Sequence, residues 1–65
     1  MRIDRVKLAA ELAKRDMTQK RLAELSGVSR ATVNYVRADK SCTDEVGQKI
    51  AQALRVDVTE ILEEE

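Results

Sequence analysis

The side chains of this sequence that are best placed to do chemistry gather around one tight junction, in residues 18–38. One predicted helix ends there at Gly27, the chain turns through Val28, and a second helix begins at Ser29, all within about three residues. A turn this short sets two helices at a steep angle, and the second helix of such a pair can lie in the major groove of DNA. The segment therefore points to non-covalent recognition of a nucleic acid and reads TQKRLAELSGVSRATVNYVRA.

The residue types around the junction meet the demands of this helix-turn-helix unit. Ala23 is small at the point where the two helices cross, and Gly27 can take the positive φ that the turn needs. The space between the helices is filled by Val28, Val33 and Val36. Several matches together indicate this unit more strongly than a single glycine at a helix junction would.

The composition excludes most other chemistries. The chain has 65 residues, no histidine and one cysteine, Cys42. These counts remove histidine-based acid–base catalysis, multi-cysteine zinc sites and an intramolecular disulfide. There is also no serine or cysteine nucleophile beside a base and no phosphate-binding glycine loop. We therefore expect no enzyme, no cofactor and no metal, and we expect Cys42 to be inert, with a redox switch or an intermolecular disulfide as the alternatives.

The charges are separated along the chain, although their formal sum is zero. Residues 1–40 hold ten Lys and Arg against five Asp and Glu, whereas residues 41–65 hold two against seven. A basic face for phosphate can therefore exist without a basic pI, and the acidic end over residues 57–65 should point away from DNA. The alternative is that both charge blocks only keep a small domain soluble.

The remaining features predict a single all-α domain over residues 1–65. The composition is 43% hydrophobic and 37% charged, with no proline and one aromatic residue. No apolar run approaches the ~18 residues that cross a bilayer, and Met1 to Glu11 carries charges where a signal segment would be hydrophobic. We expect a cytoplasmic protein that does not bind membranes.

Apolar periodicity and capping residues predict five short helices in this domain. The fourth helix buries Val46, Ile50 and Leu54, and the short fifth helix buries Val58, Ile61 and Leu62. Gly47 inside the fourth helix costs about 1 kcal/mol relative to alanine, which predicts that another helix approaches closely there. The predicted N-caps of the five helices are Asp4, Thr18, Ser29, Thr43 and Asp57.

Residues 18–38, and less tightly Asp4–Leu62, resemble the Cro and phage-repressor (Xre-like) helix-turn-helix family. Residues 46–62, VGQKIAQALRVDVTEIL, are similar to the fourth and fifth helices of that family. The resemblance implies a compact five-helix domain that binds double-stranded operator DNA, usually as a two-fold dimer, and regulates transcription.

The resemblance also assigns roles to individual residues. Arg30 can take O6 and N7 of guanine together, and Asn34 can read adenine in the same way. Ala31 or the methyl of Thr32 can touch a thymine methyl, and Tyr35 can reach a phosphate or stack on the sugar edge. The base-reading set is Arg30, Ala31, Thr32, Asn34 and Tyr35, and the phosphate-binding set is Thr18, Gln19, Lys20, Arg21, Ser29, Arg37 and Lys40.

The sequence departs from the family pattern at three places. Many members pair an arginine of the first helix with a glutamate at the end of the third, and here those positions hold Leu12 and Arg37. Arg37 is therefore free to contact DNA or an acid such as Asp39. The loop that often reads Asn-Gly-Lys is Ala38-Asp39-Lys40, and the glycine that commonly ends the fourth helix is replaced by Arg55, which predicts strain at that cap.

We therefore expect a sequence-specific DNA-binding transcriptional regulator of prokaryotic or phage type. Specific affinity generally needs two half-sites, so a homodimer with recognition helices about 34 Å apart is expected. The alternative is an antitoxin or a protein-interaction module that binds a partner protein through the fifth helix or the acidic end. The expected dimer surface is formed by Val56, Val58, Ile61 and Leu62.

Overall fold

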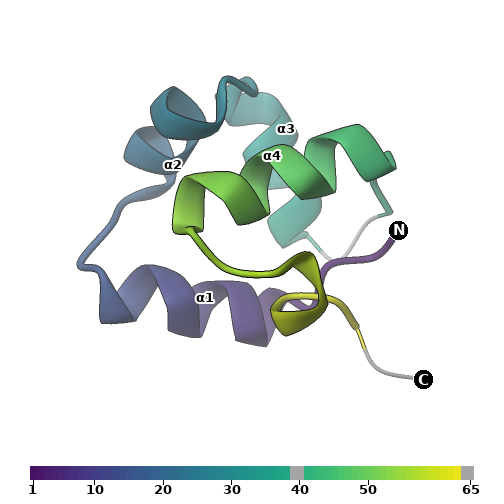
Figure 1. Ribbon diagram of the computed structural model, residues 1–65. Helices are drawn as coiled ribbons and strands as arrows, with labels where there is room; N and C mark the ends of the chain where they lie inside the picture. Colours follow the sequence, from purple (N-terminus) through teal and green to yellow (C-terminus); the bar gives the residue numbers. More distant parts are fainter. Residues whose placement is uncertain (39–40, 64–65) are drawn as a thin grey trace.

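The computed structural model describes residues 1–38 and 41–63. These residues form four α-helices, α1 (Arg5–Lys14), α2 (Gln19–Ser26), α3 (Arg30–Arg37) and α4 (Asp44–Leu54), followed by one 3₁₀ turn, η1 (Val58–Glu60). In Figure 1, α4 lies above α1, α3 lies behind α4, and α2 lies at the upper left. No helix in the described part of the chain is both long and apolar enough to span a membrane.

The predicted N-caps of the four α-helices are confirmed. Each cap residue has an extended backbone, and its side-chain oxygen accepts a hydrogen bond from a backbone N–H in the first helical turn. Local sequence therefore decides where these helices begin. Asp4 accepts hydrogen bonds from the N–H groups of Val6 and Lys7, and Thr18 accepts one from the N–H of Arg21. In the same way Ser29 accepts from the N–H of Thr32, and Thr43 from the N–H of Val46.

The prediction of a fifth helix was wrong, because the segment after Asp57 closes into a single 3₁₀ turn. Asp57 accepts hydrogen bonds from the backbone N–H of Thr59 at 2.9 Å and from its hydroxyl at 2.7 Å. These bonds lower the pKa of Asp57 below its ordinary value. Beyond the turn, Leu62 pairs in antiparallel fashion with Ile3, so the chain is extended where a helix would have continued.

One apolar core joins all the elements. The helix α1 buries two leucines, α4 buries a stripe of isoleucine, alanine and leucine, and the α2–α3 pair buries the side chains between its two helices. Ile3 and Ile61, which lie outside the helices, complete the core. The buried apolar residues are Ile3, Leu8, Leu12, Leu22, Ala23, Val33, Val36, Ile50, Ala51, Leu54 and Ile61.

The first three residues form an extended strap that sequence patterns did not reveal. Met1 exchanges two backbone hydrogen bonds with Cys42, at 2.7 and 2.8 Å. On the other side of the strap, the Arg2 carbonyl accepts from the N–H of Glu63 at 3.0 Å. The strap therefore connects the loop before α4 to the end of the described chain.

The nearest atoms to Gly47 belong to this strap, where a close approach of another helix was predicted. A Cβ atom placed on Gly47 would overlap the Sδ atom of Met1. The missing side chain in α4 therefore makes room for a methionine from the N-terminal strap.

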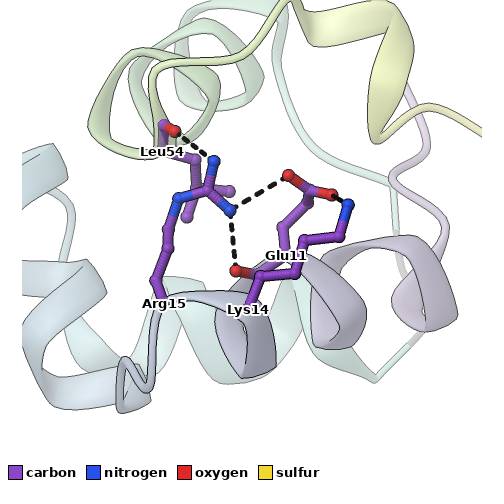
Figure 2. A network of polar contacts seen from close by, with 4 residues as sticks. All are labelled: Glu11, Lys14, Arg15 and Leu54. Atoms are coloured by element: carbon purple, nitrogen blue, oxygen red, sulfur yellow. Dashed lines mark hydrogen bonds and ion pairs between the residues drawn. The ribbon is translucent and has the colours of Figure 1, made fainter.

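A single arginine connects the C-terminal ends of α1 and α4 (Figure 2). Arg15 donates from one guanidinium nitrogen to the Leu54 carbonyl at 2.8 Å, and from the other to the Glu11 carbonyl at 2.8 Å and carboxylate at 3.0 Å. The last carbonyls of a helix have no partner within it, so this guanidinium satisfies acceptors on two helices at once. Hydrogen bonds from Lys14 and Arg15 lower the pKa of Glu11 below its ordinary value. These ion pairs therefore stabilise the fold at pH values above the ordinary carboxyl pKa. The stabilisation is lost as the pH falls through the lowered pKa of Glu11.

The predicted strain at the end of α4 is confirmed. Arg55 takes a left-handed conformation with φ of 59°, which costs a residue with a Cβ about 1 kcal/mol or more relative to glycine. The hydrogen bond from Arg15 to Leu54 supports the same helix end from outside.

We expect Arg15→Ala to lower the free energy of unfolding by about 1.5–3 kcal/mol, because it removes charge-assisted hydrogen bonds to a carbonyl of another helix. Lys14→Ala is the matched control, since Lys14 is 69% exposed and pairs with the same Glu11 carboxylate at 2.9 Å. That variant should lose less than about 0.5 kcal/mol. Urea unfolding of both variants measures the difference, and equal losses would show that Arg15 acts only as a surface ion pair.

Candidate nucleic-acid interface

The turn between α2 and α3 has the geometry that its sequence predicts. Gly27 is left-handed, with φ of 78°, and its N–H donates to the Ala23 carbonyl at 3.0 Å. Ala23 is 6% exposed, and its small side chain permits the close crossing of the two helices. Val33 and Val36 are fully buried and Val28 is half-buried. The helix-turn-helix unit over residues 18–38 is therefore held by the contacts expected of it.

The outer face of α3 carries most of the predicted base-reading residues. Arg30, Ala31, Asn34 and Tyr35 are all exposed, and Tyr35 keeps 54% of its surface accessible. Ala31, Asn34 and Tyr35 lie on the side of the helix opposite to the buried valines, and Arg30 lies at the edge of that face. The structure thus brings them together on one surface.

Thr32, the fifth predicted base reader, differs from the other four. It is half-buried, its N–H donates to Ser29 Oγ at 3.1 Å, and the two hydroxyl oxygens lie 2.8 Å apart. Its position in the structure is that of a partner in the cap of α3. Ser29 itself is exposed and lies at the N-terminus of the helix, where an anion is favoured.

The start of α2 offers a second set of groups suited to phosphate. Thr18 Oγ1 accepts the N–H of Arg21 at 3.1 Å, and its own hydroxyl hydrogen remains to be donated. Gln19 is half-buried and Lys20 is exposed. Arg21 has a weak ion pair with Glu24 at 3.5 Å, in which both side chains are more than half exposed.

The cations of the helix-turn-helix unit are mostly unneutralised. Within the described residues, Lys20, Arg30 and Arg37 make no hydrogen bond or ion pair through their side chains. Residues 18–38 hold four cations against one acid, a net charge of +3. Elsewhere Lys14 and Lys49, among others, pair with carboxylates. Arg5 and Arg55 are also exposed and without a partner among the described residues, so three of these five unpaired cations lie on α2 and α3.

The departures from the family pattern are also visible. Leu12 is a core residue, 5% exposed, and Arg37 is half-buried at the end of α3, so no ion pair joins α1 to α3 at these positions. Asp39, a predicted partner of Arg37, and Lys40, a predicted phosphate contact, lie outside the described residues.

Comparison with known proteins decides the family. The model of the Cro/C1-type helix-turn-helix DNA-binding domain matches residues 7–65. The chain belongs to this Cro/C1-type family. Among solved structures it is similar to the transcriptional regulator VanUg, with 31% identity and a TM-score of 0.82, over 95% of this chain and 83% of that one. A comparison with curated proteins finds no match.

The same fold also occurs within larger enzymes. A mutant of hydroxyethylphosphonate dioxygenase is similar to this chain with a TM-score of 0.86 and 25% identity, and cadmium-containing PhpD with a TM-score of 0.84 and 25% identity. The comparison covers 98% of this chain in each case, but the chain spans only 14% of the length of those proteins. A domain with this fold can therefore be a small part of a larger protein.

The residues predicted for a dimer surface of this Cro/C1-type domain do not all lie at the surface. Val56, Val58 and Leu62 are half-buried, but Ile61 is fully buried within its own chain. The Ile61 carbonyl accepts a hydrogen bond from the N–H of Asp4 at 2.8 Å. Ile61 therefore offers no surface to a second protomer, contrary to the prediction.

Cys42 lies apart from the helix-turn-helix surface, in the loop before α4. It is half-buried, and burial raises the pKa of its thiol above the ordinary value. A raised pKa leaves less of the reactive thiolate at neutral pH.

Proposed function

We propose that this protein is a sequence-specific DNA-binding transcriptional regulator of prokaryotic or phage type, which acts in the cytoplasm and inserts α3 into the major groove of its operator. The observation that carries the proposal is the coincidence of two properties on one surface. The outer face of α3 is exposed and rich in hydrogen-bonding side chains, and three of the four cations of the unit, Lys20, Arg30 and Arg37, have no carboxylate partner among the described residues.

Family membership and the similarity to VanUg, a transcriptional regulator, support the same proposal. The phosphate contacts would come from the N-termini of α2 and α3, through Thr18, Gln19 and Ser29, and from the cations of the unit. The base contacts would come from the outer face of α3.

Selection of bound sites from a random pool of duplex DNA tests the function directly. We expect an enriched palindromic sequence with two half-sites separated by about one helical turn. If no sequence is enriched and the protein instead forms a stoichiometric complex with one partner protein, it is an antitoxin or an interaction module.

We further propose that the protein binds its operator as a homodimer, because one helix-turn-helix unit supplies few contacts. The surface available for this contact is formed by the half-buried Val56, Val58 and Leu62, without Ile61. The mass of the complex on the selected duplex tests the proposal, and one protein per duplex would contradict it.

The charge distribution predicts how salt affects binding. Lys20→Gln should weaken binding to all sequences to a similar degree and lower the slope of log affinity against log salt by about 0.9, the counterion release of one phosphate contact. A salt series of binding titrations measures this slope. An unchanged slope would mean that the N-terminus of α2 does not face the DNA backbone.

Two controls belong to this series. Lys49→Gln removes a cation of α4 that pairs with Glu45 at 3.1 Å, outside the helix-turn-helix unit, and should leave the slope unchanged. Removal of residues 63–65 should also leave it unchanged, because beyond about 10 Å in 0.1 M salt the repulsion of those carboxylates is screened. Of these residues, Glu64 and Glu65 lie outside the described residues.

A further inference from the structure

The strap, residues 1–3, pairs with other parts of the chain on both of its sides. The loop flank is residues 41–42, which follow α3, and there the N–H of Cys42 donates to the Met1 carbonyl at 2.8 Å. The Met1 thioether also fills the space that a side chain at Gly47 would take. This flank therefore joins the strap to the loop after α3 and to α4.

The C-terminal flank is residues 61–63. The N–H of Glu63 donates to the Arg2 carbonyl at 3.0 Å, and Arg2 Nε lies 3.1 Å from the Glu63 carboxylate. The N–H of Asp4, directly after the strap, donates to the Ile61 carbonyl at 2.8 Å. The strap thus lies between two segments that are distant from each other in the sequence.

Each flank needs the other to hold the strap in place. Two extended segments paired alone are marginally stable in water, and each pair here involves only two or three residues. Within the strap, Ile3 is the one buried side chain, and the hydrogen bonds of both flanks keep it in the core. When either flank detaches, the remaining pair is too short to retain Ile3.

We infer that residues 1–3, 41–42 and 61–63 form one latch, which opens and closes as a unit while the four helices stay folded, and which couples the C-terminal flank to the loop after α3. Opening of such a local unit has a lower free energy than global unfolding. By linkage, a contact that stabilises one flank also stabilises the other.

The latch connects two surfaces that are otherwise separate. Leu62, which pairs with Ile3, is a half-buried residue of the C-terminal flank and belongs to the proposed dimer surface. A second protomer seated on Leu62 would therefore also order the segment that follows α3, a consequence that rests on the proposed dimer.

Amide hydrogen exchange of the whole chain, without DNA, measures the latch. The amide of Cys42 reports on the loop flank, and the amides of Asp4 and Glu63 report on the C-terminal flank, since each donates a hydrogen bond within the latch. The amide of Leu12, within α1, is the reference for global unfolding. In the wild type, the three latch amides should exchange faster than that of Leu12.

Glu63→Pro perturbs the C-terminal flank by removing the N–H that donates to Arg2. The amide of Cys42, on the opposite flank, should then exchange about 2- to 10-fold faster, the effect of one lost hydrogen bond. Glu63→Gln is the matched control, because it keeps the N–H and loses only an ion pair whose side chains are both more than 40% exposed. It should speed the exchange of Cys42 less than Glu63→Pro does.

Gly47→Ala perturbs the loop flank. Its methyl group would overlap the Met1 Sδ and displace that side chain, although alanine is the better helix former. The amide of Glu63, on the opposite flank, should exchange about 2- to 10-fold faster, as for one lost contact of this size. Gln48→Ala, at an exposed neighbouring position of α4, is the control and should leave the exchange of Glu63 unchanged.

Each variant perturbs one flank and is measured on the other. If both effects cross the strap while Leu12 keeps its wild-type protection, the latch opens as a unit separate from the helices. If each variant speeds exchange only on its own flank, the flanks fray independently and there is no latch. An equal loss of protection at Leu12 would also overturn the latch, since the strap would then open only with global unfolding.

Discussion

Replacing Arg30 with alanine is expected to lower affinity for the selected operator by about 10- to 100-fold per half-site, or about 1–3 kcal/mol, while affinity for a scrambled duplex changes little. Arg30 is exposed at the first position of α3 and has no partner among the described residues, so its full hydrogen-bonding capacity is available to a base. A bidentate contact to guanine discriminates between sequences, and a contact to phosphate does not. Titrations on operator and scrambled duplexes measure both affinities.

Arg21→Ala is the matched control for this prediction. Arg21 is also exposed, but it lies on α2, where contacts to phosphate are expected. Its loss should weaken binding to both duplexes equally. If Arg30→Ala gives the same pattern as Arg21→Ala, Arg30 is a phosphate anchor, and base recognition depends on the other exposed residues of α3.

Replacing Ile61 with alanine is expected to lower the free energy of unfolding by about 2–5 kcal/mol. Ile61 is fully buried in the core of its own chain, so truncation leaves a cavity as well as lost apolar contacts. Domains of this size are stabilised by only about 3–5 kcal/mol, so this variant should be largely unfolded at room temperature. Urea unfolding followed by circular dichroism measures the loss.

Two further variants keep this prediction testable. Ile61→Val should remain folded and lose about 0.5–1.5 kcal/mol. Val58→Ala removes atoms from a half-buried neighbour and should cost less than Ile61→Ala. The losses at Ile61 should be the same at low and high protein concentration. A loss that grows with dilution would show that Ile61 stabilises a dimer, as its sequence pattern suggested.

The turn between α2 and α3 shows how much of the binding surface the sequence can predict. The caps Thr18 and Ser29, the left-handed Gly27 and the buried Val33 and Val36 are all where their pattern places them. Each depends on residues within about four positions along the chain, since capping bonds and helical faces are local. Local chemistry thus determines which residues α3 exposes at its first turns.

Thr32 shows that the helical pattern alone leaves the edge of the buried face open. We predicted it to be a base reader because it matches the first turn of the family's recognition helix. The structure gives it a half-buried position and a hydrogen bond to Ser29. A helical pattern gives the order of residues around the axis, but the edge of the buried face depends on how deeply the neighbouring helices cover it.

Local sequence patterns were sufficient to predict the four α-helices, their caps, the helix-turn-helix unit and the separation of charge. Contacts between residues far apart in the chain were needed to show that residues 1–3 form a strap, that no surface of Ile61 is left for a dimer, and that Arg15 supports the end of α4. The bond from Arg15 to the Leu54 carbonyl joins residues 39 positions apart, and that from Met1 to Cys42 joins residues 41 positions apart. No local periodicity encodes such pairs, because an extended segment of three residues is too short to show alternation and a single carbonyl has no sequence signature.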